Sequence, residues 1–269
     1  MADEGREANQ LRNEMAHLDV ELLAVLDKRA RAARQLRDLR RDHPASLPPT
    51  NHALIGDLVA RSTGDMPRES LVVILREVHA ACLTLELPVV VTFAGTAGGS
   101  EQAAALRRFG RGAHLIPVVT AAKALEEVSL KHAEFAVIPF ETAIDGPVHS
   151  SILALAATDL RIAEVLESDG VRYAVVATRP SGRTASDVTA IVFSVQDSPG
   201  ALLDVLRVFA ERSINLTNVL SHPVDGKAWT YLFYIEMPGH FTDRTLVTAF
   251  EEMKRLTRFF KLLGSYPAP

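Results

Sequence analysis

Several features that often mark a protein's class are scarce in this chain of 269 residues. Its one cysteine, Cys82, cannot form an intramolecular disulfide, which is typical of a reducing cytoplasm. No stretch approaches the roughly 18 apolar residues that a membrane span needs, and the polar N-terminus does not resemble a secretory signal. The sequence therefore predicts a soluble cytoplasmic protein with no membrane partner.

Excess positive charge and metal-ligand spacing are also missing. The formal net charge is −4, so we expect no nucleic-acid partner. The His, Cys and carboxylate residues show none of the usual spacings of a metal site, and we expect neither a metal nor another cofactor. The apolar fraction of 48% is ample for packed cores.

The first segment, residues 1–87, predicts an all-helical domain. One long helix is expected over 9–41 and two more over 52–63 and 68–86, with prolines marking the breaks. Because three helices of this length bury little surface alone, we expect a homodimer or a higher homo-oligomer. The long helix also carries an apolar seam with alternating spacings of four and three residues, typical of a helix that packs along another helix: Leu11, Met15, Leu18, Leu22 and Val25.

Two further domains are expected. Residues 88–180 alternate between strand and helix patterns, which favours an α/β domain with a mainly parallel sheet. A linker over 179–187 precedes the last domain, 187–269, which reads βαββαβ in the ferredoxin-like order. The expected strands are 89–93, 114–118, 135–139, 173–178, 188–195, 214–221, 228–236 and 258–264, and the expected helices are 101–109, 120–131, 201–212 and 242–257.

The last domain carries the most specific motifs. Residues 198–202 read Ser-Pro-Gly-Ala-Leu and residues 263–267 read Leu-Gly-Ser-Tyr-Pro. They resemble the ACT domain that ends prephenate dehydratases, where phenylalanine binds as a feedback inhibitor. Gly200 lets a ligand approach the backbone and opens a helix whose N–H groups can receive a carboxylate.

The resemblance implies an effector site in two parts. One part is Gly200, Ala201 and Leu202, and the other is Ser221 with His222. The family has a Glu-Ser-Arg-Pro tetrapeptide at the second part, but this chain reads Leu-Ser-His-Pro at 220–223. The change removes an acid and a base able to make charge-assisted contacts.

The helical segment resembles the all-helical chorismate mutases, which bind their substrate through cationic side chains. Arg12, Arg29 and Arg40 fall where that family places these cations. At about 100° per residue, Arg29 and Arg40 lie within roughly 20° of one helix face. Arg12 points elsewhere, as expected of a side chain that reaches the partner subunit's pocket. The alternative is a solvated basic helix, since other cations flank these three.

The next two helices depart from the mutase pattern. The family's acidic residue and Arg-Glu pair have no counterpart at 49–53, although a small shift of register would bring Asn51 or His52 into the pocket. The family's Ser and Gln positions align with Cys82 and Glu86, which share a helix face. Glu86 must be protonated to donate to the substrate's ether oxygen, which favours acidic pH.

The middle segment resembles the first subdomain of prephenate dehydratase. Ser100 and Gln102 match its substrate loop, and Glu141 matches a family Glu or merely caps a turn. Arg172 matches the Arg of a Thr-Arg-Phe motif whose Thr is replaced by Val171. The family inserts a whole second subdomain before this motif, and its active site lies in the cleft between the two. Only a few residues stand there in this chain, so we expect dehydratase activity to be absent.

Together the segments resemble the bifunctional P-protein, a chorismate mutase and prephenate dehydratase with a C-terminal ACT domain. Three functions stay open. The first is a weak chorismate mutase, an isomerase rather than a lyase, in phenylalanine biosynthesis. The second is a non-catalytic regulatory or assembly protein with an ACT domain. The third is a protein whose pockets are retuned for a metabolite derived from chorismate or prephenate. The expected ligands are chorismate, prephenate or L-phenylalanine.

Overall fold

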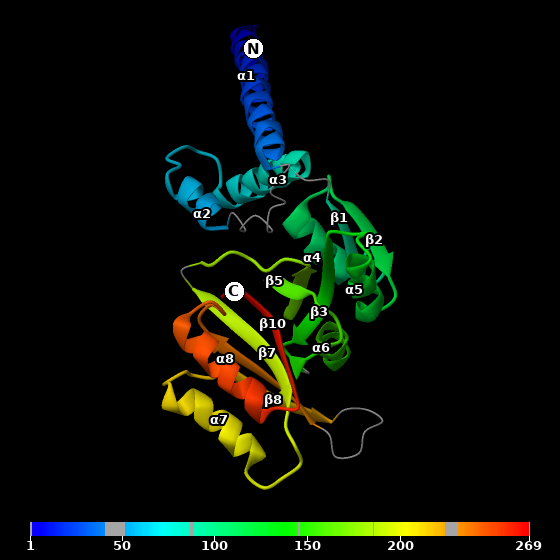
Figure 1. The fold of residues 1–269 in the computed structure, drawn as a ribbon. Coiled ribbons are helices and arrows are strands. Elements are labelled where there is room, and N and C mark those ends of the chain that lie inside the picture. Colours follow the sequence, from blue (N-terminus) through cyan, green and yellow to red (C-terminus); the bar gives the residue numbers. More distant parts are fainter. Residues whose placement is uncertain are drawn as a thin grey trace. The chain divides into compact units, whose positions relative to one another are not determined.

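The computed structural model describes residues 2–40, 52–86, 89–144, 146–184, 186–223 and 231–268. The chain divides into two compact units, a helical unit built on the first three helices and a sheet unit built on the rest (Figure 1). Within the described ranges no helix is both long and apolar enough to cross a membrane.

The helical unit contains α1 (Ala2–Arg40), α2 (His52–Ala60) and α3 (Arg68–Glu86). The α3 bounds match the sequence prediction, whereas α1 begins earlier than expected and α2 ends three residues sooner. The second half of α1 packs on α3 and buries Ala33. By contrast, every side chain from residue 5 to residue 25 is exposed, including the whole apolar seam.

The sheet unit is a single mixed sheet with helices on its faces. Its strand order is β2-β1-β3-β6-β5-β10-β7-β9-β8, with the short β4 paired to β3. The elements are β1 (Val90–Ala94), α4 (Ser100–Phe109), β2 (His114–Val118), α5 (Ala121–Ser129), β3 (Phe135–Thr142), β4 (Gly146–Pro147), α6 (His149–Ala156), β5 (Arg161–Ser168), β6 (Val171–Ala177), β7 (Asp187–Ser194), α7 (Ala201–Glu211), β8 (Asn218–Pro223), β9 (Tyr231–Pro238), α8 (Arg244–Leu256) and β10 (Phe259–Pro267).

The prediction of a mainly parallel sheet is wrong for half of the α/β segment. Strand β1 is parallel to β2 and β3, but β6 is antiparallel to both β3 and β5. The cause is a hairpin between β5 and β6, in which Asp169 and Gly170 both have positive φ, 53° and 73°. An Asp-Gly pair suits such a two-residue turn, so the sequence did contain a signal for the hairpin.

Strand β8 begins at Asn218, four residues later than predicted. The preceding Ile214 instead donates its backbone N–H to the carbonyl of Phe209 and so extends the end of α7. Helix α6 and strand β5 were not predicted, since their apolar runs are short and lack a clear period.

Two apolar clusters of the sheet unit lie on opposite faces of β7. Ile191 and Phe193 of β7 pack with α7 and α8, which lie side by side (Figure 1). Ala190 and Val192 of the same strand belong to the cluster that also contains α5 and α6. Because both faces of β7 are buried, its central residues 190–193 are all apolar.

Gly264 lies where the α/β segment meets the last four strands. Strand β5 pairs with β10 in parallel through Ile162 and Gly264. A Cβ at Gly264 would lie 2.3 Å from the carbonyl oxygen of Ile162 and 2.8 Å from its nitrogen, both backbone atoms. Only glycine permits this approach, so the glycine of the Leu-Gly-Ser-Tyr-Pro motif allows the two parts of the sheet to join.

Candidate functional site

Of the predicted mutase residues, Arg29 is placed against α3. Its guanidinium donates a hydrogen bond to the backbone carbonyl of Val78 at 3.1 Å. Cys82 lies one turn further along α3 and is buried, and Glu86 follows half-buried on the same face. Arg29 therefore joins α1 to α3, on which Cys82 and Glu86 share a helix face.

Within the described residues, the side chain of Arg12 is not brought to this place. Arg12 is exposed and bonds Asn9 of its own helix at 3.3 Å. The side chains of Arg40 and His52, and all of Asn51, lie outside the described residues. Among the described side chains, Arg29 is thus the only one of the three arginines that contacts α3.

Two further polar residues of α3 were missed by the sequence reasoning. The pKa of His79 is lowered, first by burial and then by the charge of Arg29, so the imidazole lies close to that guanidinium. Arg76 has a buried Nε with no hydrogen-bond partner among the described residues. Their spacing was the available signal, because His79 lies three residues before Cys82 and Arg76 three before His79, and residues three apart are neighbours on a helix.

The four dehydratase-like residues all bond to the protein itself. Ser100 shares a side-chain hydrogen bond with Tyr173, a fully buried residue next to Arg172. Gln102 accepts a hydrogen bond from the backbone N–H of Gly98 at 2.6 Å and so fixes the loop before α4. The other two residues, Glu141 and Arg172, form an ion pair.

Arg172 is the centre of a network that joins β3, β6, β9 and β10. Beside Glu141 it also contacts Glu236, with 3.4 Å between its Nη2 and the carboxylate Oε1. The same Oε1 accepts hydrogen bonds from Tyr234 at 2.5 Å and from Tyr266 at 2.8 Å. We call these five residues the junction network.

Burial makes the junction network an electrostatic unit. Glu236, Tyr234 and Tyr266 are each at most 6% exposed. Burial lowers the pKa of Arg172, but Glu236 and then Glu141 outweigh it and hold the pKa above its usual value. Burial also raises the pKa of both tyrosines well above the ordinary value, so both hydroxyls remain donors. Sequence reasoning missed Glu236, although a carboxylate in an otherwise apolar strand is a signal of a buried polar contact.

The predicted effector residues fall into two separate places. Gly200 adopts a left-handed conformation, φ 86°, immediately before α7, and Ala201 and Leu202 form the first turn of that helix. Ser221 and His222 lie on β8 and line a small cavity of about 20 Å³ with His149 of α6 and Tyr234. None of residues 200–202 lines this cavity. Burial, and then the charge of His222, lower the pKa of His149.

Comparison with known proteins identifies the two halves of the sheet unit. The prephenate dehydratase family matches residues 91–194, and the ACT domain family matches residues 189–255. The sheet unit is thus a prephenate dehydratase segment joined to an ACT domain.

The whole chain is similar to longer, bifunctional proteins. It is 28% identical to the bifunctional chorismate mutase/prephenate dehydratase of Aquifex aeolicus, over 97% of this chain and 98% of that protein. That alignment extends over 356 positions, so it contains long gaps in this chain of 269 residues. The chain is therefore a shorter homologue, along its whole length, of the bifunctional chorismate mutase/prephenate dehydratases.

Solved structures resemble the fold. The prephenate dehydratase of Arthrobacter aurescens, determined in complex with L-Phe, superposes with a TM-score of 0.59 at 22% identity and covers 67% of this chain and 90% of its own. A protein described as a novel type of quorum quenching acylase, GqqA, superposes with a TM-score of 0.57 at 25% identity and covers 67% of this chain and 95% of its own. One fold thus carries differently named activities, and the function must be argued from the sites.

Proposed function

We propose that this protein acts in aromatic amino-acid biosynthesis as a P-protein-like chain with at most weak chorismate-to-prephenate mutase activity and no dehydratase activity. The junction network is the observation that carries the second part. Glu141 and Arg172, which the family resemblance assigns to prephenate, are paired with each other and with Glu236. A substrate would have to break a charge-assisted network to use either residue.

The β5–β6 hairpin supports the same conclusion. Ser168 ends β5 and Val171 begins β6, so two residues stand where the family inserts its second subdomain. Decarboxylative elimination needs an acid placed at the leaving hydroxyl, and a cleft that excludes water around it. This chain has only one of the two subdomains that form the cleft, and Val171 replaces the Thr hydroxyl. It therefore supplies neither the acid nor the closed cleft.

The case for residual mutase activity rests on Arg29. Rearrangement of chorismate needs no covalent group, only a pocket that holds a compact conformer and stabilises separating charge. Arg29 at the α1–α3 contact retains part of such a pocket. We place Cys82 and Glu86, which share a face of α3, as its further members. Each preorganised contact that is lost costs about 10²- to 10³-fold in rate, so the activity is weak.

A second copy of the chain completes this proposal. The seam of α1 is exposed along its length, with Leu18 at 55% and Leu22 at 56% exposure. Such a stripe is buried when two copies of the helix pack together. Pairing along it gives a homodimer and carries Arg12 toward the partner's pocket.

The test is a pair of assays on the purified protein, with the Aquifex aeolicus relative as positive control. We expect chorismate consumption at least about 10²-fold below the control in kcat/KM, and no conversion of prephenate. Glu86→Gln, whose amide N–H can donate to the ether oxygen without protonation, should raise kcat/KM for chorismate. Measurable dehydratase turnover would contradict the proposal, and so would mutase activity equal to the control.

A non-catalytic ACT sensor is the second candidate. The observation in its favour is that the dehydratase-like strand β6 is tied through Arg172 to Glu236 of the ACT domain. L-phenylalanine should then raise the melting temperature even where no turnover is found, because a ligand of the native state stabilises it. D-phenylalanine is the matched control. The third candidate, a retuned pocket, requires that a chorismate- or prephenate-derived metabolite stabilise the protein more than L-phenylalanine does.

A further inference from the structure

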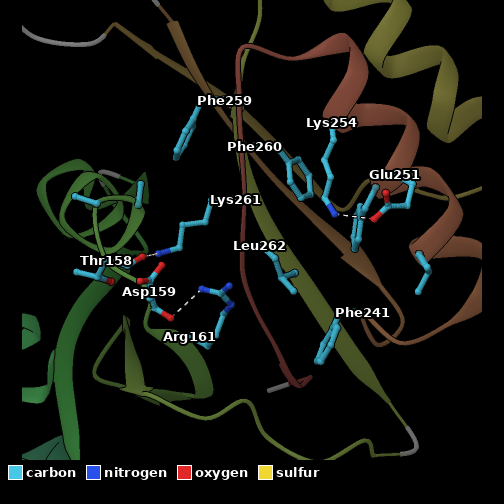
Figure 2. A pocket seen from close by; sticks show the side chains of 14 residues that line it. Thr158, Asp159, Arg161, Phe241, Glu251, Lys254, Phe259, Phe260, Lys261 and Leu262 are labelled. Carbon is cyan, nitrogen blue, oxygen red and sulfur yellow. Dashed lines mark hydrogen bonds and ion pairs between the residues drawn. The ribbon is translucent and has the colours of Figure 1, made fainter. Parts of the chain in front are cut away.

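A cavity of about 580 Å³ opens beside β10, apart from all the residues considered above. One wall is the turn between α6 and β5, residues 156–161, and the other is α8 with residues 259–262 of β10 (Figure 2). Its volume falls within the roughly 300–1,000 Å³ of small-molecule sites.

The cavity exists because β10 separates from β5. Strand β10 is paired with β7 from Phe259 to Pro267, but among the described residues it pairs with β5 only at Gly264. The first half of β10 therefore has an open edge toward the turn. An open strand edge presents backbone N–H and C=O groups, which a ligand can use.

Arg161 supplies hydrogen-bond donors to this space. Its Nη1 donates to the carbonyls of Asp159 at 3.1 Å and Leu160 at 3.0 Å. Within the described part of the chain, its Nε and Nη2 have no hydrogen-bond partner. A guanidinium with free donors in a fork geometry is matched to a carboxylate.

Lys261 stands beside Arg161 and is only 8% exposed. Its Nζ donates to the carbonyl of Leu155 at 2.6 Å and to that of Thr158, at the C-terminal end of α6. This contact closes the helix end, as a cation there often does. Two carbonyls use two of its three protons, so one donor remains.

The charges that line the cavity do not cancel. Lys254 is bonded to Glu251 at 2.7 Å across one turn of α8, which leaves Arg161 and Lys261 with Asp159 alone. Burial, and then the charge of Arg161, lower the pKa of Lys261 to about 8, although Asp159 acts in the opposite direction. Burial likewise lowers the pKa of Arg161. An anion between the two cations would relieve this destabilisation.

Apart from the Lys254–Glu251 pair, the lining on the α8 side is apolar. The rings of Phe250 and Phe260 contact each other with centroids 5.5 Å apart, and Leu262 and the half-exposed Val247 continue their surface. In Figure 2 the ring of Phe260 lies on the α8 side of β10, whereas Lys261 and Arg161 lie on the side of the turn. A flat apolar group can pack there while its charged end reaches the turn.

We propose that this cavity binds a small aromatic carboxylate, whose carboxylate accepts hydrogen bonds from Arg161 and Lys261 and whose ring packs against Phe260 and Leu262. The site is separate from residues 200–202 and 221–222 and does not depend on either enzymatic activity. The proposed ligand carries a carboxylate and a ring, as L-phenylalanine does, and it would bind at the junction of the α/β segment with the ACT domain.

The first experiment compares three probes by isothermal titration calorimetry. We expect 3-phenylpropionate to bind with a Kd below about 1 mM. Propionate lacks the ring and phenethylamine lacks the carboxylate, so both should bind at least about 10-fold more weakly. Equal binding of phenethylamine, or no binding of 3-phenylpropionate at about 5 mM, overturns the proposal.

Matched variants locate the binding. Val247→Trp fills the cavity from an exposed position and should abolish binding, whereas Thr248→Trp adds the same side chain to an exposed neighbouring position that does not line the cavity. Arg161→Gln should weaken binding at least about 10-fold. If 3-phenylpropionate binds Val247→Trp and Arg161→Gln as it binds the parent chain, its site is elsewhere and the proposal is wrong.

Proton uptake gives an independent reading. A carboxylate beside Lys261 favours its charged form, so binding near pH 8 should take up protons and the measured enthalpy should vary with the buffer's ionisation enthalpy. The charged groups that face Lys261 are Arg161 of β5, Asp159 of the turn and the Lys254–Glu251 pair of α8. Lys261→Met should lose the uptake and Lys123→Met, at an exposed position of α5, should keep it. Binding without uptake in the parent chain contradicts the assignment of Lys261.

Discussion

The helical unit and the sheet unit differ in how far their apolar side chains are buried. In the sheet unit, both faces of β7 are covered, and Ile191 and Val192 are fully buried. In the helical unit, α1 exposes every side chain from residue 5 to residue 25. The sheet unit thus buries its apolar side chains within one chain, whereas α1 leaves its apolar seam exposed, as the proposed pairing with a second copy requires.

The arginine side chains of the two units also differ, in how fully they are paired within one chain. In the junction network Arg172 pairs with two carboxylates, Glu141 and Glu236, and two tyrosine hydroxyls in turn donate to Glu236. In the helical unit, Arg12 bonds only its own helix among the described residues, and Arg76 has a buried Nε without a partner. The predictions below test this contrast, from the largest expected effect to the smallest.

The largest effect is expected at Gly264. Gly264→Val places a branched side chain against the backbone of Ile162, which cannot move without separating β5 from β10. We expect a loss of more than about 4 kcal/mol in the free energy of unfolding of the sheet unit, measured by urea denaturation. Gly182→Val is the control, since a Cβ there meets nothing within 4 Å. Equal stabilities would show that the two parts of the sheet do not need their junction.

Arg172 should have the next largest effect. Arg172→Met leaves the carboxylate of Glu236 buried without its cation, which costs about 3–5 kcal/mol. Arg183→Met removes an exposed ion pair with Asp243 and should cost less than about 1 kcal/mol. Adding Glu236→Gln to Arg172→Met should restore part of the loss. A double variant that is less stable than Arg172→Met would contradict the role given to the network.

The seam of α1 should govern assembly rather than the stability of the sheet unit. Leu22→Glu puts a charge into the proposed dimer contact and should weaken association by about 2–3 kcal/mol, roughly 100-fold in Kd, by analytical ultracentrifugation. Val20→Glu is the matched control, because Val20 is equally exposed but lies on the opposite face of the helix. If both variants associate alike, the seam is not the contact.

The smallest effect concerns Lys261 and pH. Its pKa in the folded protein, about 8, lies below the ordinary value of 10.5. Between those values the unfolded chain binds more protons, so the destabilisation is complete below pH 8 and disappears as the pH rises toward 10.5. The stability of the parent chain relative to Lys261→Met should therefore rise by about 1–2 kcal/mol between pH 7 and pH 9.5. A difference that is constant with pH would show that Lys261 is not destabilised by burial.

The reliability of the sequence predictions followed the length and period of the patterns. Helix α3, with a proline before it and a clear apolar stripe, was placed to the residue. Helix α6 and strand β5, each eight residues long, were missed because short apolar runs have no distinctive period. The missed β5 also caused the wrong expectation about the direction of β6.

The candidate sites were predicted as residue types but not as contacts. Sequence placed Glu141 and Arg172 in one resemblance, and the structure pairs them. Glu236 could not be joined to them, because it lies 64 residues beyond Arg172 and only strand register brings it near. The cavity beside Lys261 was invisible for a similar reason, since it arises from the angle at which β10 leaves β5.

By itself, the sequence determined most of the elements in their order, the apolar seam of α1 and the relation to a family of bifunctional enzymes. These depend on local spacing and on motifs within a few residues, such as the one that contains Gly264. Tertiary structure alone decided that the dehydratase-like strands and the ACT domain share one sheet. Backbone pairing between distant strands leaves no period in the chain, so the partners of Arg172 and the surroundings of Lys261 emerge only when the sheet closes.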